Sequence, residues 1–299
     1  MKTYNLRILL VLSVLFVFGT MGSVLAASSD EIPTNLTFGQ WTGESFTLLP
    51  LAADEQASGY GLFPTDQAEQ GFEGDRSLRI SYAEHVGKQV TISQVVTYSA
   101  GRYMNEAIVY MTVNDTGETL AGRTIRDQLE GLVLTSDVNN ARQQFLNTVV
   151  YPKYRVLSAV SSTGTDAPID LSIGSAVTVV DVITGVSTQK PICLIVSVNG
   201  QKAMLPIAYS YTNVSVNTWK KTVAWQDDLF TQNPKLTLGW SEDVWNNIEA
   251  GNVENGMTKG QIQLSWGRAS DRESDDSAWI YGTKRLKFSG DVLTSIEAK

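Results

Sequence analysis

The chain has almost none of the residue types on which acid–base, nucleophilic or metal chemistry depends. Its 299 residues include one histidine, His85, and one cysteine, Cys193. A multi-histidine metal site is therefore excluded, and any serine or cysteine nucleophile would have to use His85 as its base. His85 stands in a short polar stretch before a strand pattern, where we expect a surface histidine. The sequence predicts neither an enzyme nor a cofactor.

Several binding motifs are missing as well. The chain has no glycine-rich phosphate loop, and the acidic stretch 271–276 lacks the alternating oxygen ligands, the turn glycine and the terminal glutamate of a calcium loop, so we expect a solvated loop there. A net charge of −8 without a basic cluster argues against nucleic acid and anionic lipid as ligands. Composition leaves open only a pair of carboxylates that meet in space, as in glycoside hydrolases.

The amino terminus has the three regions of a secretory signal. Lys2 and Arg7 precede an apolar run at 8–18, and small residues at 24–26 precede Ala27. The run is shorter than the roughly 20 residues that span a bilayer, and no later segment is long and apolar enough. We expect residues 1–26 to be removed, with an uncleaved anchor as the alternative. The mature chain would then have no transmembrane span, and a single cysteine in an exported chain favours a bacterial source.

Between this signal and residue 219 the sequence is rich in strand patterns, and the patterns recur. Alternating apolar segments 90–97 and 177–184 align at an offset of 87 residues, each after a glycine, and the segments 109–114 and 194–199 align at an offset of 85. Short strands at this spacing predict two duplicated small β-barrels or open meanders, and they resemble barrels of the Src-homology-three type. We expect a first β repeat domain with a helix at 27–160, a second at 161–218 after a polar linker, and a connector at 219–239.

The last sixty residues predict a small α+β module. Thr258 and Gln261 have the spacing of a capping box, Met257 can contact Ile262 across the helix start, and Gly267 can end the helix. A second capped helix follows Ser241. Three strand patterns then follow, at 278–281, 285–288 and 292–296. The predicted fold class is therefore mainly β, with a two-helix, three-stranded antiparallel domain at 240–299.

This module resembles the BamE (SmpA/OmlA) family of bacterial envelope proteins. The resemblance lies in Gly256-Met257-Thr258, Gln261-Ile262, Leu264-Ser265-Trp266-Gly267 and Trp279-Ile280-Tyr281, which occur in the family's order. The chain departs from the pattern at Arg268-Ala269, where a proline is usual, and it has no lipid-attachment cysteine after the signal. The resemblance implies two helices against a three-stranded sheet and, more weakly, a role in outer-membrane barrel assembly, since it covers about a fifth of the chain.

These observations predict a non-enzymatic, exported envelope protein that binds or scaffolds another protein. We expect it in the periplasm or envelope of a Gram-negative bacterium or secreted from it, with peripheral association to the outer membrane as a further expectation. Tryptophan is favoured at binding hot spots, and four of the seven tryptophans lie in the last sixty residues. The candidate interaction surface comprises Met257, Trp266, Trp279 and Tyr281.

Two alternative functions are left open. A cell-wall or carbohydrate-binding protein would have a groove lined by tyrosines, either Tyr98, Tyr103 and Tyr110 or Tyr209 and Tyr211. An inhibitor of a secreted hydrolase would act through the loop at 268–277.

Overall fold

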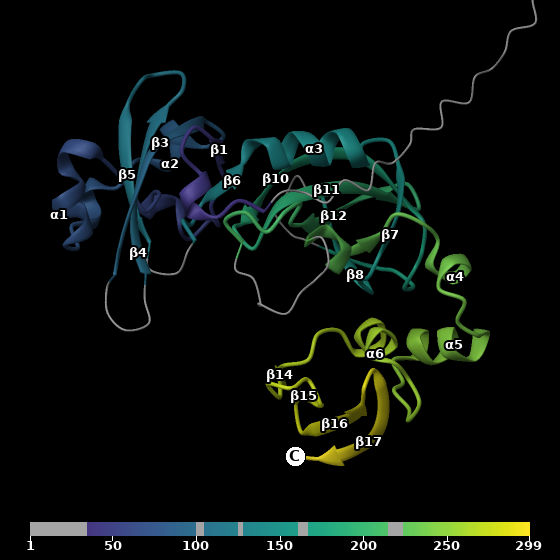
Figure 1. Cartoon of the computed structure of the whole chain (residues 1–299). Coiled ribbons are helices and arrows are strands. Elements are labelled where there is room, and N and C mark those ends of the chain that lie inside the picture. Colours follow the sequence, from purple (N-terminus) through teal and green to yellow (C-terminus); the bar gives the residue numbers. More distant parts are fainter. Residues whose placement is uncertain (1–34, 100–104, 125–127, 161–166, 215–223) are drawn as a thin grey trace, which may run out of the picture. The chain divides into compact units, whose positions relative to one another are not determined.

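The computed structural model describes residues 35–99, 105–124, 128–160, 167–214 and 224–299. Within these ranges the protein is mainly β, as predicted, with three antiparallel sheets and a few short helices (Figure 1). The signal at 1–26 lies outside the described residues. The longest helix in the described ranges has 11 residues, and none of the helices there is long and apolar enough to cross a membrane.

The first sheet has the strand order β2-β5-β4-β3-β1-β6. Alternating side chains bury one face around Trp41, Phe46 and Leu62, as expected for strands with one solvated face. Two short helices, α1 (Ala68–Phe72) and α2 (Tyr82–His85), lie between β2 and β3. The strands of this sheet are β1 (Ser45–Leu48), β2 (Leu62–Pro64), β3 (Gln89–Ser99), β4 (Asn105–Val113), β5 (Thr119–Thr124) and β6 (Leu132–Leu134).

The second sheet has the order β13-β7-β10-β11-β12-β8-β9. Its strands are β7 (Val149–Pro152), β8 (Val156–Ala159), β9 (Pro168–Asp170), β10 (Val177–Ser187), β11 (Lys190–Val198), β12 (Gln201–Ile207) and β13 (Leu229–Phe230). This corrects the predicted sheet membership, because β7 and β8 lie in the range assigned to the first repeat but pair with β10 and β12. Their partners are distant in sequence, and a short strand pattern does not reveal which sheet it joins.

The two sheets use equivalent registers. β3 and β10 both have 11 residues, follow a glycine with positive φ and skip one residue against the next strand. The skipped residue lies between Ile92 and Gln94 in β3 and between Val179 and Asp181 in β10, positions that the sequence alignment equates. The outer strands agree as well. On one side of β3 lie β1 and then β6, and on the same side of β10 lie β7 and then β13. Six strands of each sheet therefore correspond in order.

Helix α3 (Thr135–Phe145) joins the two sheets and occupies the predicted helix at 137–146. It packs on β10 and β11 and also contacts β1 and β6 (Figure 1). Asn213 reinforces this joint, because its buried amide accepts from Leu129 N–H at 2.7 Å and donates to the carbonyls of Leu129 and Leu132 at 2.8 and 2.7 Å. A side chain after the second sheet thus satisfies backbone groups of the first.

The C-terminal segment, residues 240–299, begins with two capped helices. Thr258 and Gln261 form the predicted capping box, Ser241 caps the earlier helix, and Gly251 ends that helix with a left-handed backbone. A sheet of order β14-β15-β16-β17 follows, so the prediction of three strands is wrong by one short strand inside the predicted loop. The elements from residue 234 onward are α4 (Pro234–Thr237), α5 (Glu242–Ala250), α6 (Lys259–Trp266), β14 (Asp271–Arg272), β15 (Ala278–Tyr281), β16 (Lys284–Ser289) and β17 (Val292–Ala298).

Candidate functional site

Two of the four residues predicted for the interaction surface lie in the core instead. Met257 is 5% exposed and Trp279 is 2% exposed, in the hydrophobic cluster between α5, α6 and the last sheet. Met257 is buried because it packs with Ile262 across the start of α6, and Trp279 is buried because its ring lies 5.1 Å from Phe288. Neither side chain is available to a partner.

The other two predicted residues, Trp266 and Tyr281, are half-buried and contact each other. Their rings meet edge to face at 5.4 Å, and each ring donates a hydrogen bond to a backbone carbonyl, Trp266 to Gly251 and Tyr281 to Gly267. Burial raises the pKa of Tyr281 to about 12. Both side chains fix the end of α6 against β15, and their role in binding stays a prediction.

His85 and Cys193, the only histidine and the only cysteine of the sequence, are both buried and held by contacts within the fold. His85 is buried rather than on the surface as predicted, with Nδ1 2.8 Å from the Ser81 carbonyl and Nε2 3.0 Å from a Glu118 carboxylate oxygen. These partners hold the ring within α2 and against the turn before β5. Cys193 lies buried in β11, and burial raises the pKa of its thiol to about 11, which disfavours the reactive thiolate.

The tyrosines predicted for a carbohydrate groove are described only in part. In the first set Tyr110 packs beside Phe63 and Phe72, while Tyr103 and the side chain of Tyr98 lie outside the described residues. In the second set Tyr209 is buried in the core near Phe145, and Tyr211 is half-buried and donates its hydroxyl to an Asp227 carboxylate oxygen at 3.3 Å. Tyr209 is therefore not open to a ligand, and the groove of Tyr98, Tyr103 and Tyr110 stays a prediction.

Arg155 joins the second sheet to the C-terminal segment. It precedes β8, and its guanidinium donates to the carbonyls of Ile248, Glu249 and Ser265, near the ends of α5 and α6. The last carbonyls of a helix lack partners within the helix and carry its negative dipole end, so a cation there is favourable. Ile173, just before β10, is 1% exposed and completes the same contact by packing into the cluster of the C-terminal segment.

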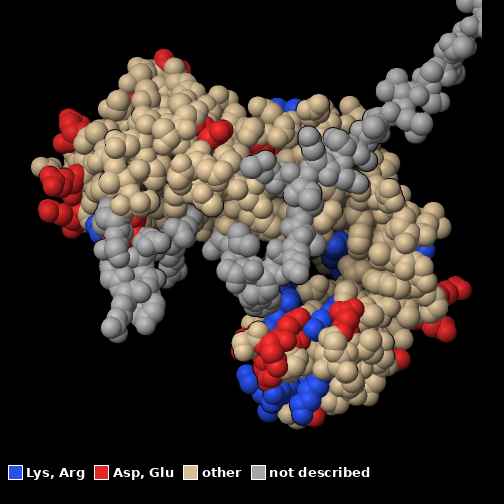
Figure 2. Space-filling model, viewed as in Figure 1, with Lys and Arg blue, Asp and Glu red and all other residues tan. Residues whose placement is uncertain are grey.

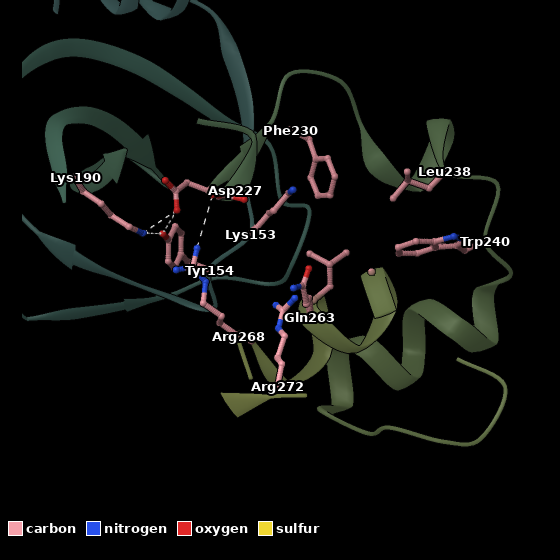
Figure 3. A pocket seen from close by; sticks show the side chains of 14 residues that line it. Lys153, Tyr154, Lys190, Asp227, Phe230, Leu238, Trp240, Gln263, Arg268 and Arg272 are labelled. Carbon is pink, nitrogen blue, oxygen red and sulfur yellow. Dashed lines mark hydrogen bonds and ion pairs between the residues drawn. The ribbon is translucent and has the colours of Figure 1, made fainter. Parts of the chain in front are cut away.

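A cavity of about 580 Å³ lies beside this joint, and we call it the junction pocket (Figure 3). This volume lies within the range of small-molecule and peptide-binding sites. The second sheet and the connector contribute one wall, and α6 with the residues after it contributes another. The lining residues are Lys153, Tyr154, Lys190, Asp227, Asp228, Phe230, Leu238, Trp240, Gly260, Gln263, Leu264, Gly267, Arg268 and Arg272.

A partly buried polar network of Lys190, Tyr154 and Asp228 forms one end of the junction pocket. The Lys190 ammonium lies 2.7 Å from a carboxylate oxygen of Asp228 and donates to the Tyr154 hydroxyl, which in turn donates to the same carboxylate. Burial and the neighbouring Asp228 both raise the pKa of Tyr154, so this phenol keeps its proton and acts as a donor. The network satisfies Asp228, which is 4% exposed, and holds the lysine charge at a fixed place on the wall.

Two arginines extend the positive charge from the side of α6. Arg268 is mostly exposed and lies 3.7 Å from Asp227, and Arg272 places its guanidinium 4.1 Å from the centre of the Trp279 ring. Figure 2 shows most of the visible lysine and arginine atoms over and beside the C-terminal segment, where acidic atoms lie among them, whereas the region around α1 shows mainly acidic atoms. The lining of the junction pocket contains four cationic and two anionic side chains, in a chain whose net charge is −8.

The opposite end of the junction pocket is apolar. Leu238 and Trp240 lie there, away from Lys190 and Tyr154 (Figure 3), and the Trp240 ring packs against Trp245 at a tilt of 40°, with ring centres 5.2 Å apart. The face of α6 between the two ends presents glycine, glutamine and leucine at helical spacing, with Gly260, Gln263, Leu264 and Gly267. Glycine exposes the helix backbone, and Gln263 offers both an amide donor and an acceptor.

Sequence reasoning did not find the junction pocket. Its residues come from the end of β7, the start of β11, the connector, α6 and the loop after α6, and no local motif unites these segments. One signal was present, since Asp227-Asp228 falls inside a predicted connector and two consecutive carboxylates there need partners. Recognition required the pairing of β7 with β13, which places Lys153 beside Asp228.

The arrangement can bind a ligand at two points, by charge at one end and by apolar contact at the other. In the described residues no group of three or more histidine, cysteine or carboxylate side chains is placed to hold a metal ion. Comparison of the chain with protein-family models, with curated proteins and with solved structures gives no match.

Proposed function

We propose that this protein is an exported, non-enzymatic protein of the bacterial envelope that binds another protein at the junction pocket. The observation that carries the proposal is the pocket itself, which the second sheet, the connector and the C-terminal segment build jointly. A site assembled from two packed elements is a common location for recognition, because each element supplies part of the chemistry. The signal pattern at 1–26 supports export, and we propose the periplasm or the periphery of the outer membrane as its place.

The finer fold assignment belongs to this proposal. Two duplicated barrels of the Src-homology-three type are supported by the shared strand order, by the shared skipped residue and by the short strands β2 and β8, which pair with β5 and β12 in the two sheets. A BamE-like module at 240–299 is supported by the observed capping box and by two helices followed by an antiparallel sheet. Its fourth strand, β14, departs from the pattern that the resemblance implies.

A photo-crosslinking experiment in the native envelope tests the binding function. A photo-reactive phenylalanine replaces Leu238, which lines the pocket and is 37% exposed, and in a matched protein it replaces Leu236, which is 81% exposed and does not line the pocket. We expect one protein, identified by mass spectrometry, to be captured from position 238 and much less from 236. Capture from neither position, or only from 236, would argue against the pocket as the binding site.

A blocking variant provides the control for folding. Gly260 lines the pocket, and an added Cβ there would meet only the Thr258 hydroxyl, at 4.0 Å, so the backbone has room for a side chain and Gly260→Phe is designed to occupy the pocket. We expect this variant to melt like the wild type and to lose capture at position 238. Unchanged capture from position 238 in the Gly260→Phe variant would contradict the proposal.

The two alternative functions make different predictions. A pull-down with purified peptidoglycan that leaves the protein in the supernatant rules out cell-wall binding. The inhibitor alternative gains one observation, because the loop at 268–277 supplies Arg268 and Arg272 to the pocket lining. Under that alternative the captured partner is a secreted hydrolase, and Arg268→Glu weakens its inhibition.

A further inference from the structure

We infer that the junction pocket recognises a peptide segment of its partner that carries a carboxylate and, further along the segment, an apolar side chain. This inference rests on the proposed function and adds the chemistry of the ligand. It follows from three features of the lining: its charge, its apolar end and the backbone of α6 between them.

The charge of the lining selects an anionic ligand. Lys153, Lys190, Arg268 and Arg272 lie on the same lining, where Lys190 contacts Asp228, Arg268 lies 3.7 Å from Asp227 and Arg272 lies 3.8 Å from Asp276. Cationic side chains gathered on one wall raise the local concentration of an oppositely charged group. The lining therefore suits a ligand that carries a carboxylate.

The geometry of the cations favours carboxylates in particular. Arg268 is exposed on the rim, 3.7 Å from Asp227, a distance too long for a strong hydrogen bond. A guanidinium can exchange such a contact for a two-point interaction with an incoming carboxylate, because its planar N–H groups match the two oxygens. Lys190 is held on the opposite wall by Asp228 and Tyr154, so its charge needs no reorganisation when the ligand binds.

The apolar end and α6 specify the rest of the ligand. Leu238 is 37% exposed and Trp240 half-buried, so the two offer an apolar surface that remains wet without a ligand. Gly260 and Gly267 open the face of α6 on either side of Gln263, whose amide can pair with a peptide group. An extended peptide spans these features with a carboxylate at one end and a leucine-like or aromatic side chain at the other.

Selection from a random peptide pool tests this inference with the full mature chain. One pool of octapeptides has free carboxy termini and a second pool ends in carboxamides, which separates a terminal carboxylate from a side-chain carboxylate. We expect enriched peptides to combine an acidic group with an apolar residue at the other end of the bound segment and to bind more weakly as salt is raised. Enrichment of basic peptides, enrichment without charge preference, or no enrichment from either pool would overturn the inference.

Matched charge reversals locate the binding on the protein. Arg268→Glu reverses a charge in the lining, and Lys284→Glu makes the same change on the same sheet-and-helix segment but outside the lining. For the enriched peptide we expect Arg268→Glu to raise the dissociation constant about tenfold or more, which corresponds to the loss of one charged hydrogen bond. Lys284→Glu should change it less than about twofold, as typical of exposed charges. Equal effects of both reversals would also contradict the inference.

The peptide selection and the crosslinking experiment can fail separately. A partner captured at position 238 together with a peptide pool that shows no acidic preference leaves the binding function standing and removes the ligand chemistry. Enriched acidic peptides without any captured partner would support the ligand chemistry of the pocket and leave the proposed binding of a partner protein in the envelope without support.

Discussion

The first and second sheets use the same strand register, yet they differ at the end where the junction pocket lies. Leu49 donates its backbone N–H to the Gly131 carbonyl at 2.8 Å, and Lys153 donates to the Asp228 carbonyl at 2.9 Å in the equivalent place. Leu49 is buried in the core cluster that the second sheet forms with α3, and Gly131 leaves room for the Tyr60 ring, whereas Lys153 and Asp228 line the junction pocket. The same backbone contact therefore lies in a closed core in one sheet and beside a cavity in the other.

Glycine at 131 has a clear steric cause. Its φ is +79°, and an added Cβ would lie 3.0 Å from the Tyr60 ring, which fills the end of the first sheet. Arg155 stands directly before β8, the strand of the second sheet equivalent to β2, and its guanidinium donates to carbonyls near the ends of α5 and α6. Tyr60 fills the core of the first sheet, whereas Arg155 binds the C-terminal segment to the second sheet.

Removing the Tyr60 side chain should have the largest effect on stability. Tyr60 is 1% exposed and donates its hydroxyl to the Leu49 carbonyl at 2.6 Å, so Tyr60→Ala leaves a cavity and an unpaired carbonyl. We expect a loss of about 4 kcal/mol in the free energy of unfolding, against about 1 kcal/mol for Tyr60→Phe, measured by denaturant titration. A loss below about 1 kcal/mol for Tyr60→Ala would show that this end of the first sheet is not a closed core.

Much of this fold could be predicted from local sequence. Caps and alternation act over a few residues, so the sequence predicted helices α3, α5 and α6 and the capping box at Thr258. For the same reason it predicted that β3 and β10 occupy equivalent positions in the two sheets. Sheet membership of β7 and β8 was not readable, since it depends on pairing with distant strands. The site was missed for the same reason, and Met257 and Trp279 were wrongly placed on the surface because residue type alone does not report burial.

The joint between the sheets should make stability depend on pH. Asp137, in the first turn of α3, is 5% exposed and accepts from the Ser210 hydroxyl at 2.6 Å, and burial raises the pKa of its carboxyl to about 7 from 3.8. A raised folded pKa means that the stabilisation is fully present below about pH 4 and is lost as pH rises through 7. The loss should amount to about 4 kcal/mol between pH 4 and pH 8, at about 1.4 kcal/mol per unit of pKa difference.

Replacement of this carboxyl tests that dependence directly. Asp137→Asn keeps the size of the side chain and an oxygen that can accept from Ser210. Its free energy of unfolding, measured at a series of pH values, should exceed that of the wild type by a growing margin as pH rises from 4 to 8. Asp66→Asn, on the exposed stretch before α1, should follow the wild type throughout. Parallel curves for Asp137→Asn and the wild type would contradict the assignment.

The smallest effect should follow from Arg155, because its contacts hold only the C-terminal segment. Arg155→Ala removes donors from the carbonyls of Ile248, Glu249 and Ser265, and we expect a loss of about 2 kcal/mol. The loss should be local, so limited proteolysis should remove residues after 240 while the two sheets remain intact, and Arg155→Lys should be intermediate because an ammonium cannot reach all three carbonyls. Proteolysis that instead attacks both sheets at once would show that Arg155 supports the second sheet itself, and the contrast with Tyr60 would no longer hold.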